Sequence, residues 1–156
     1  MQLDHNMDDM INIIKNSTPL IDLRAPIEFN KGAFPSSINI PILNDTQRAT
    51  IGIIYKKEGS QFAEKLGFDL VKSQKDKIVY LWEKFIKENP TAYIYCMRGG
   101  KRSQIAKSWL HDEGIDTPTV KGGYKSLRKA SIEILNSATH DQKSWIILAG
   151  RTGTGK

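Results

Sequence analysis

The spacing of apolar residues predicts strands that alternate with helices along most of the chain. Short apolar runs between turn residues indicate buried strands, and apolar residues three or four positions apart indicate helices with one buried face. The predicted strands are 20–23, 37–40, 92–95, 119–120 and 144–149. The predicted helices are 6–16, 26–32, 46–57, 60–71, 75–87, 103–113 and 124–136. This order predicts an α/β fold with a central, mainly parallel sheet flanked by helices.

The second and third predicted strands are separated by a long helical stretch, at about residues 45–89. We interpret this stretch as a helical insert in the α/β fold. Its last helix has an apolar face that we expect to pack on the core. That face comprises Ile78, Leu81, Trp82, Phe85 and Ile86.

The last predicted strand is followed by a sequence that matches the phosphate-binding loop G-x-x-x-x-G-K. The match covers residues 150–156, and the Ser or Thr and the helix that complete such a loop do not follow. We therefore predict a first domain over residues 1–140 and a truncated P-loop nucleotide-binding-type domain over residues 141–156. The candidate phosphate-binding residues are Gly150, Gly153, Gly155 and Lys156.

Composition excludes several classes of protein. No apolar run approaches the ~20 residues that cross a bilayer, and the N-terminus lacks the pattern of a secretory signal. We therefore expect a protein that does not bind membranes. One cysteine excludes an internal disulfide, which fits the reducing cytoplasm. No metal site is predicted, because His5, His111 and His140 are far apart and have no neighbouring ligand residue.

The net charge of +6 is concentrated in one part of the chain. Residues 96–129 contain eight basic and three acidic residues, which is a net charge of +5. Such a basic segment suits a polyanionic partner, and nucleic acid is the first candidate. For Lys125 and Lys129 alone, a solvated helix face explains the charge at least as well.

The candidate chemistry is at Cys96, which lies between a predicted strand and a predicted helix. A strand, a glycine-containing loop and a helix N-terminus make a site for an anion, because backbone amides and the helix dipole converge there. The predicted anion-binding loop is Met97, Arg98, Gly99, Gly100, Lys101, Arg102 and Ser103. Its three cations should surround the sulfur and lower its pKa from ~8.5 into the range of roughly 3.5–7.5. A buried cysteine without chemistry is the alternative, and it does not explain the cations.

Residues 22–41 resemble the signature of rhodanese sulfurtransferase domains at the Asp, Arg, Glu, Phe, Gly and Asn-Ile-Pro positions. Residues 120–124 are similar to that family's late V-x-G-G-aromatic element. The resemblance implies a rhodanese-like domain in which Cys96 carries sulfur or selenium, cradled by the amides of residues 97–102. It also implies that Asp22, Arg24 and Glu28 are supports. For Asp22 and Arg24 we expect pairing with loop cations or amides.

The length of the loop departs from this family. Five residues separate Cys96 from Arg102, whereas most sulfur-transferring rhodaneses have four. The longer spacing is that of cysteine phosphatases, but they usually have histidine where this chain has Tyr95. A phosphatase also needs a general acid, and none can be placed from the sequence. A phosphatase, a generic sulfurtransferase with weak thiosulfate activity and an inactive binding module therefore remain alternatives.

Four further segments resemble tRNA 2-selenouridine synthases. They are the helical insert at 45–67, the loop C-x-R-G-G-x-R-S, S-W-L-x-x-x-G-I-D at 108–116 and G-G-Y-K-x-L-R at 122–128. In that family a second domain starts with a phosphate-binding loop, as at residue 150 here. The resemblance implies exchange of the 2-thio sulfur of a tRNA wobble uridine for selenium from selenophosphate. The sulfur is first geranylated from geranyl diphosphate.

The same resemblance implies the roles of residues and partners. The Cys96 thiolate would attack selenium, or hold it while phosphate leaves. The partners are tRNA with a wobble 2-thiouridine and an enzyme that donates selenophosphate, and no cofactor is bound covalently. The truncated P-loop would hold a diphosphate or a nucleotide. The basic segment would contribute phosphate contacts to tRNA, and this prediction competes with the solvated helix face.

Overall fold

Three short parallel strands form the sheet at the centre of the molecule. A computed structural model describes residues 5–138, 146 and 149–153. Strand β1 (Leu20–Asp22) lies in the middle, between β2 (Ser37–Asn39) and β3 (Tyr93–Tyr95). The register places Asp22 opposite Asn39 on one side and Tyr95 on the other. All three strands therefore end at the same edge of the sheet, where the candidate loop begins.

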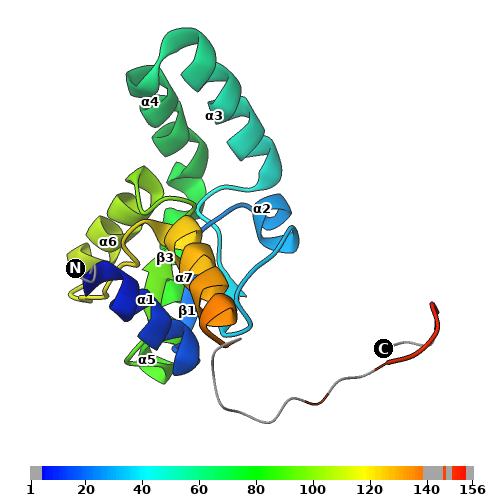
Figure 1. The fold of residues 1–156 in the computed structure, drawn as a ribbon. Helices are drawn as coiled ribbons and strands as arrows, with labels where there is room; N and C mark the ends of the chain where they lie inside the picture. Colours follow the sequence, from blue (N-terminus) through cyan, green and yellow to red (C-terminus); the bar gives the residue numbers. More distant parts are fainter. Residues whose placement is uncertain (1–4, 139–145, 147–148, 154–156) are drawn as a thin grey trace.

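Helices cover both faces of the sheet (Figure 1). Helices α1 (His5–Lys15) and α7 (Gly123–Ala138) pack on the face that carries Leu20 and Tyr95. Helices α5 (Lys75–Glu88) and α6 (Lys101–Asp112) pack on the face that carries Ile21 and Ile94. Side chains alternate between the two faces of a strand, so these short strands supply both halves of the core. Trp82 of α5 is fully buried, and its Nε1 donates a hydrogen bond to the Ile40 carbonyl at 2.9 Å.

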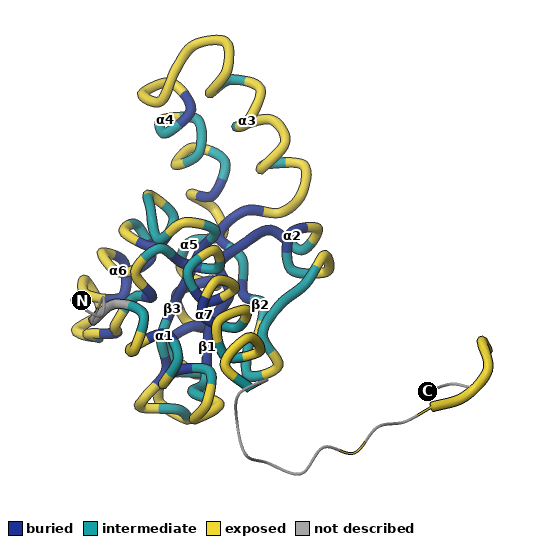
Figure 2. The backbone as a smooth tube through the Cα atoms, viewed as in Figure 1, coloured by how far each residue is buried: buried dark blue, intermediate teal, exposed yellow. Residues whose placement is uncertain are grey.

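The first two helices of the insert stand apart from this core. Helix α3 (Asp45–Glu58) and helix α4 (Ser60–Val71) form a hairpin that projects from the body of the molecule (Figures 1 and 2). The helices reverse direction at Gly59, whose φ of 88° favours glycine. A reciprocal capping box between Asn44 and Gln47 starts α3, yet none of the residues of α3 is buried. A short 3₁₀ turn, η1 (Lys72–Gln74), then leads into α5.

The α/β fold with a parallel sheet, flanking helices and a helical insert is confirmed. Short helix α2 (Pro26–Asn30) also lies where it is predicted. The predicted strand 119–120 is only a single parallel bridge between Thr119 and Ile94. The predicted strand 144–149 lies largely outside the described residues, and Ile146 and Ala149 are not in a strand. The boundary between residues 140 and 141 also lies outside the described residues, so the division into domains stays a prediction.

One residue of the predicted apolar face of α5 is not buried. Leu81 is 40 % exposed, whereas Val79, which was not assigned to that face, is 5 % exposed. Successive helical residues are about 100° apart, so Leu81 lies about 100° around the helix from Trp82, and Val79 lies about 60° from it. The buried face is therefore centred on Trp82, and it includes Val79 instead of Leu81. None of the described helices is long and apolar enough to cross a membrane.

Candidate active site

The loop after β3 has Cys96 at its base and helix α6 at its end. Cys96 directly follows the strand, packs with the apolar cluster on that face of the sheet and is 3 % exposed. Helix α6 has Gly100 as its N-cap, so it begins two residues before the predicted start at 103. Lys101 and Arg102 consequently lie in the first helical turn.

The backbone of the loop offers hydrogen-bond donors. Among the described residues, the amides of Met97, Arg98, Gly99 and Gly100 donate to no backbone carbonyl. The first amides of a helix also lack partners within the helix, and the helix dipole adds partial positive charge there. Loop and helix N-terminus together therefore form a site whose amide donors are not taken up by backbone carbonyls, which suits an anion such as the thiolate or a bound oxyanion.

The surroundings of the thiol favour its ionised form. Burial opposes ionisation, but hydrogen bonds from the Ser103 hydroxyl and the Arg98 and Ser103 amides outweigh it, together with the charge of Arg102. The pKa of Cys96 is consequently below its ordinary value. Ser103 is 1 % exposed, and its hydroxyl has no hydrogen-bond partner other than Cys96 among the described residues. This hydroxyl is therefore available to donate to the thiolate.

Glu28 holds the cation of the loop in place. Its Oε2 accepts a hydrogen bond from Arg102 Nη1 at 2.7 Å and lies 3.0 Å from Nε of Arg48 on α3. Burial of Glu28 would raise its pKa, but the hydrogen bond and charge of Arg102, the Ala25 amide and the charge of Arg48 lower it overall. Glu28 thus fixes the Arg102 guanidinium beside the loop and connects it with the insert.

The structure corrects the expected role of the other two cations. Lys101 Nζ lies 3.0 Å from Oε2 of Glu64 on α4, and the Lys101 side chain is 68 % exposed. The Arg98 side chain is also exposed, and this residue acts on the sulfur through its backbone amide. Side chains at the start of a helix point outward around its axis, so three neighbouring cations cannot all turn toward one atom. Of the three, Arg102 is the cation that stabilises the thiolate.

Asp22 and Arg24 do not pair with the loop, which corrects that expectation as well. They form a buried ion pair with each other, at 2.6 Å between Asp22 Oδ2 and Arg24 Nη2. The Arg24 guanidinium also donates to the Gly32 carbonyl at 2.9 Å and lies 3.9 Å from the ring centre of Tyr124. Asp22 accepts a 2.6 Å hydrogen bond from the Tyr95 hydroxyl, and this bond together with burial raises the pKa of Tyr95. The pair therefore supports the strand before Cys96.

Sequence reasoning missed the backbone contacts behind the loop. The amides of Tyr124 and Lys125 donate to the carbonyls of Cys96 and Met97 at 2.9 and 3.2 Å. A Cβ on Gly123 would lie 2.1 Å from the Cys96 carbonyl oxygen, and one on Gly99 would lie 2.8 Å from the Gly122 nitrogen. The signal was the pair of glycines at the start of a predicted helix, since glycine permits such close approach.

Only one of the two loop positions occupied by glycine requires a glycine. Gly99 has a φ of 66°, so glycine is required by conformation as well as by space. Gly100 has a φ of −93°, and a Cβ there would meet no atom within 4 Å. Of the two, only Gly99 therefore uses a backbone conformation that favours glycine.

Two hollows lie between the loop and the insert. An apolar cavity of about 210 Å³ lies beneath the hairpin, with Lys101 and Arg102 in its lining. An open groove of about 790 Å³ runs along α3 and has four basic residues and no acidic residue in its lining. The basic residues are Arg48, Lys56, Arg98 and Arg102.

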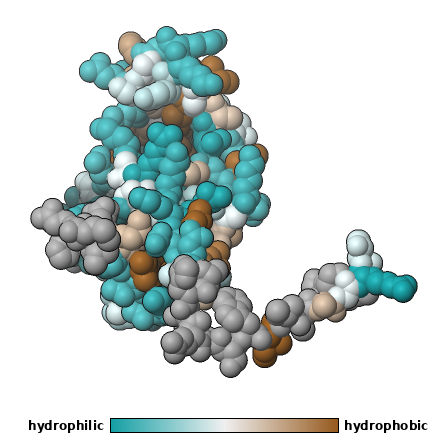
Figure 3. Space-filling view, viewed as in Figure 1, coloured by the Kyte–Doolittle hydropathy of each residue, from teal (hydrophilic) through white to brown (hydrophobic). Residues whose placement is uncertain are grey.

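In Figure 3 most of the visible face is hydrophilic, with hydrophobic residues in small separate areas.

The described residues of the predicted P-loop do not lie at this site (Figure 1). Gly150 and Gly153 are exposed and lie beyond α7, and Gly155 and Lys156 fall outside the described residues. Among the residues that the structure describes, no group of three His, Cys, Asp or Glu side chains could hold a metal ion.

Comparison with known proteins places the chain in a family. The model of the rhodanese-like domain matches residues 6–130. The chain belongs to the rhodanese-like domain family. Among solved structures, the N-terminal domain of a protein from Clostridium difficile 630 that is described as an ATP/GTP binding protein superposes with a TM-score of 0.70 at 28 % identity. It covers 74 % of this chain and 90 % of that domain.

Curated relatives of this rhodanese-like chain are named tRNA 2-selenouridine synthase. The protein from Marinobacter nauticus is 46 % identical over 96 % of the chain, and that from Sulfurovum sp. is 47 % identical over 95 %. The protein from Nitrosomonas europaea is 45 % identical over 98 % of the chain. These matches cover 41, 41 and 40 % of the relatives, so the chain spans about two fifths of their length. The resemblance inferred from the sequence motifs is confirmed.

Proposed function

We propose that the protein replaces the 2-thio sulfur of a tRNA wobble uridine with selenium from selenophosphate. The supporting observation is the buried Cys96 with a lowered pKa, at the base of a loop whose free amides and Arg102 suit a tetrahedral anion. This loop lies in a chain that is similar to proteins named tRNA 2-selenouridine synthase. Selenophosphate is a tetrahedral anion, so it suits the loop. It also carries selenium, as the activity in the relatives' name requires.

Each part of the loop has a role in this proposal. Cys96 is the nucleophile, because its environment favours the thiolate. The amides of residues 97–102 and the Arg102 guanidinium seat the phosphoryl oxygens and stabilise the charge that develops on them. Glu28 keeps Arg102 oriented. The pair of Asp22 and Arg24 keeps the strand in position.

Geranyl diphosphate is the proposed second co-substrate, which first alkylates the 2-thio sulfur. The apolar cavity beneath the hairpin supports this proposal, because its mostly apolar lining suits a branched hydrocarbon chain. In the complete protein, Gly150, Gly153, Gly155 and Lys156 would bind a diphosphate or a nucleotide. The further partners are tRNA and an enzyme that supplies selenophosphate, and the compartment is the cytoplasm.

The test is formation of 2-selenouridine by the complete protein. The protein is incubated with a tRNA that carries wobble 2-thiouridine, selenophosphate and geranyl diphosphate, and the digested nucleosides are separated and identified by mass. We expect 2-selenouridine with the wild-type protein and a loss of at least about a hundredfold with Cys96→Ser. Ser108→Ala, an exposed position on α6, is the control and should retain the activity. Unimpaired 2-selenouridine formation by Cys96→Ser would contradict the proposed role.

A phosphatase is the second candidate, because the spacing from Cys96 to Arg102 fits it. The carboxylates at the loop argue against it, because Glu28 and Glu64 are held in ion pairs. Hydrolysis of unactivated aryl phosphates at rates comparable with selenium transfer would favour the phosphatase. We expect thiosulfate to be a poor substrate, because the loop is one residue longer than in most sulfurtransferases.

A further inference from the structure

The reactive loop has the Cys-to-Arg spacing of a phosphatase loop, but among the described residues the carboxylates beside it are held in ion pairs and none is free to act as general acid. Five residues separate Cys96 from Arg102, the spacing of loops that hold a tetrahedral phosphoryl group. The carboxylates that contact the loop or its preceding strand are all held in ion pairs; they are Asp22, Glu28 and Glu64. A general acid typically contributes 10²–10⁴-fold to such a reaction. A loop without one therefore needs a leaving group that departs without a proton.

We propose that Cys96 attacks phosphorus, not selenium, and that the loop removes a phosphoryl group from a P–Se bond. This inference rests on the proposed function, which supplies selenophosphate as substrate. A selenolate is a much weaker base than an alkoxide, so it leaves phosphorus without protonation. The phosphatase-like spacing and the missing general acid then have one common explanation.

The atoms and electrons balance in three steps. Selenium of selenophosphate first displaces the alkylated sulfur from the wobble base as a thiol, and the phosphoryl group stays on selenium. The Sγ atom of Cys96 then forms an S–P bond while the P–Se bond breaks, and selenium keeps the electron pair as the selenouridine anion. Water finally attacks phosphorus, the S–P bond breaks, and phosphate and the thiolate are released. Phosphorus keeps its oxidation state throughout, so no oxidant or reductant is needed.

Attack on selenium does not balance in the same way. An S–Se bond formed by Cys96 would expel phosphorus together with the electron pair, at the oxidation state of phosphite. Release of phosphate would then require an oxidant, which the reaction does not contain. Thiosulfate differs, because attack on its outer sulfur expels sulfite, which is a stable product. Cys96 could therefore carry the outer sulfur of thiosulfate without an added oxidant. It could not carry selenium from selenophosphate and release phosphate in the same way.

The geometry around the sulfur suits a phosphoryl group. The amides of residues 97–100 have no backbone acceptor, and the planar Arg102 guanidinium is held at 2.7 Å from Glu28. The Ser103 hydroxyl is buried, favours the Cys96 thiolate by a hydrogen bond, and has no other partner among the described residues. The thiolate reappears when the S–P bond breaks, so Ser103 is placed to stabilise it as the leaving group. Ser103 is thus assigned to the release of phosphate.

Two labels separate the two kinds of attack. The complete protein is mixed with tRNA that carries S-geranyl-2-thiouridine and with selenophosphate, labelled radioactively in phosphorus in one reaction and in selenium in another. Both are stopped in neutral detergent, and label on Cys96 is counted. Ser103→Ala should accumulate phosphorus label at least about tenfold over wild type, because release is slowed, and it should carry no selenium label. Ser108→Ala, on the same helix and exposed, should match wild type, and Cys96→Ser should carry neither label.

Two results would overturn the proposal while leaving the proposed function intact. One is selenium label on Cys96 without phosphorus. The other is absence of phosphorus label in Ser103→Ala while 2-selenouridine still forms. Nucleoside analysis of the same reactions tests the proposed function separately. If the wild-type protein made no 2-selenouridine, both the proposed function and the attack on phosphorus would be contradicted.

Discussion

The reactive loop is held on its two sides by different means. On the side of α6 and the insert, charged side chains hold it, through Arg102, Glu28 and Arg48. On the side of α7, the backbone holds it, through the amide of Tyr124 and the close approach of Gly123. Backbone contacts set the shape of the loop, and side-chain contacts set its electrostatics. The two properties can therefore be changed separately.

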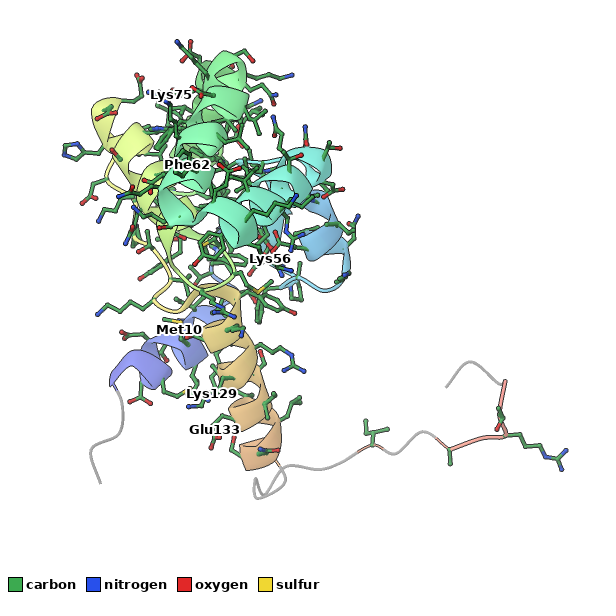
Figure 4. The ribbon with its side chains drawn as sticks, turned by 90° about the horizontal axis from the view of Figure 1, so that it is seen from above. Met10, Lys56, Phe62, Lys75, Lys129 and Glu133 are labelled. Atoms are coloured by element: carbon green, nitrogen blue, oxygen red, sulfur yellow. The ribbon has the colours of Figure 1, made fainter. Side chains whose placement is uncertain are left out.

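The basic residues differ between the same two sides. On α7 they come from one segment of the chain, with Lys125, Arg128 and Lys129 exposed along the helix. On the insert side they line a groove and come from α3, the loop and α6. Figure 4 shows Lys56 on the hairpin and Lys129 on α7, in separate parts of the molecule. Only the groove includes Arg98 and Arg102 of the reactive loop, so we expect RNA to depend more on this side.

The largest effect is expected on the backbone side. Gly123→Ala would place a Cβ 2.1 Å from the Cys96 carbonyl oxygen at a φ of 59°. We expect a loss of about 3 kcal/mol or more in the free energy of unfolding, measured by urea denaturation, because both strain and overlap must be relieved. Gly100→Ala, in the loop that Gly123 contacts, is the matched control and should stay within about 0.5 kcal/mol of wild type, because a Cβ there meets no atom within 4 Å. Equal stability of the two variants would show that α7 does not shape the loop.

The next effect concerns RNA and separates the two basic regions. Changing Arg48, Lys56 and Arg98 together to Gln should weaken binding of an anticodon stem-loop about tenfold or more in the complete protein. Because each contact with a single-strand phosphate adds ~0.7 to the salt slope, that slope should decrease by about 2. Affinity is measured by fluorescence anisotropy at several salt concentrations.

The comparison variant changes Lys121, Lys125, Arg128 and Lys129 to Gln. It removes one charge more, yet we expect a smaller loss of affinity and a smaller change in slope. The converse ranking would assign the RNA contacts to α7, as the charge distribution in the sequence first indicated. No change in either variant would mean that the rest of the protein supplies the contacts.

A smaller effect is expected in the pH dependence of Cys96. The thiolate is the reactive form, and Arg102 contributes to its lowered pKa. Arg102→Gln should therefore move the midpoint of iodoacetamide alkylation to higher pH and slow the reaction at neutral pH at least about threefold. The lowered pKa also means that the thiolate stabilises the fold above the ordinary thiol pKa, and that this stability is lost as pH falls through the folded value.

The matched control for this charge is Arg98→Gln in the same loop. The Arg98 side chain is exposed, and its amide, which remains in the variant, is the group that bonds to the sulfur. The midpoint should then stay close to that of wild type. An equal shift of the alkylation midpoint in both variants would mean that the pKa of Cys96 depends on the net charge of the loop. It would not then depend on the position in which Glu28 holds Arg102.

The smallest effect is protection of Cys96 by simple oxyanions. Sulfate, phosphate and selenophosphate should each slow alkylation about twofold or more at millimolar concentration, because the free amides are already arranged for them. Protection should persist in Arg98→Gln and be lost in Gly123→Ala, if backbone geometry is what binds the anion. Alkylation that is indifferent to all three anions would contradict a preformed site.

Local features of this chain could be predicted because they leave a pattern among neighbouring residues. Apolar spacing located the helices within a few residues, and the order of strand, glycine loop and helix marked Cys96 as the candidate nucleophile. The start of α6 was placed two residues late, because the loop glycines hid the point at which the helix begins. Leu81 was misassigned because periodicity defines a face only to within about one residue.

The sequence by itself determined the α/β order, the insert and the position of the candidate loop after Cys96, since each depends on interactions along a short stretch. Tertiary structure alone decided which cation reaches the sulfur, because Glu28 holds Arg102 from 74 residues away. It also decided that Asp22 pairs with Arg24, and that Gly123 supports the Cys96 carbonyl. Contacts between distant segments leave no periodicity and no local charge pattern, so they become visible only when the chain is folded.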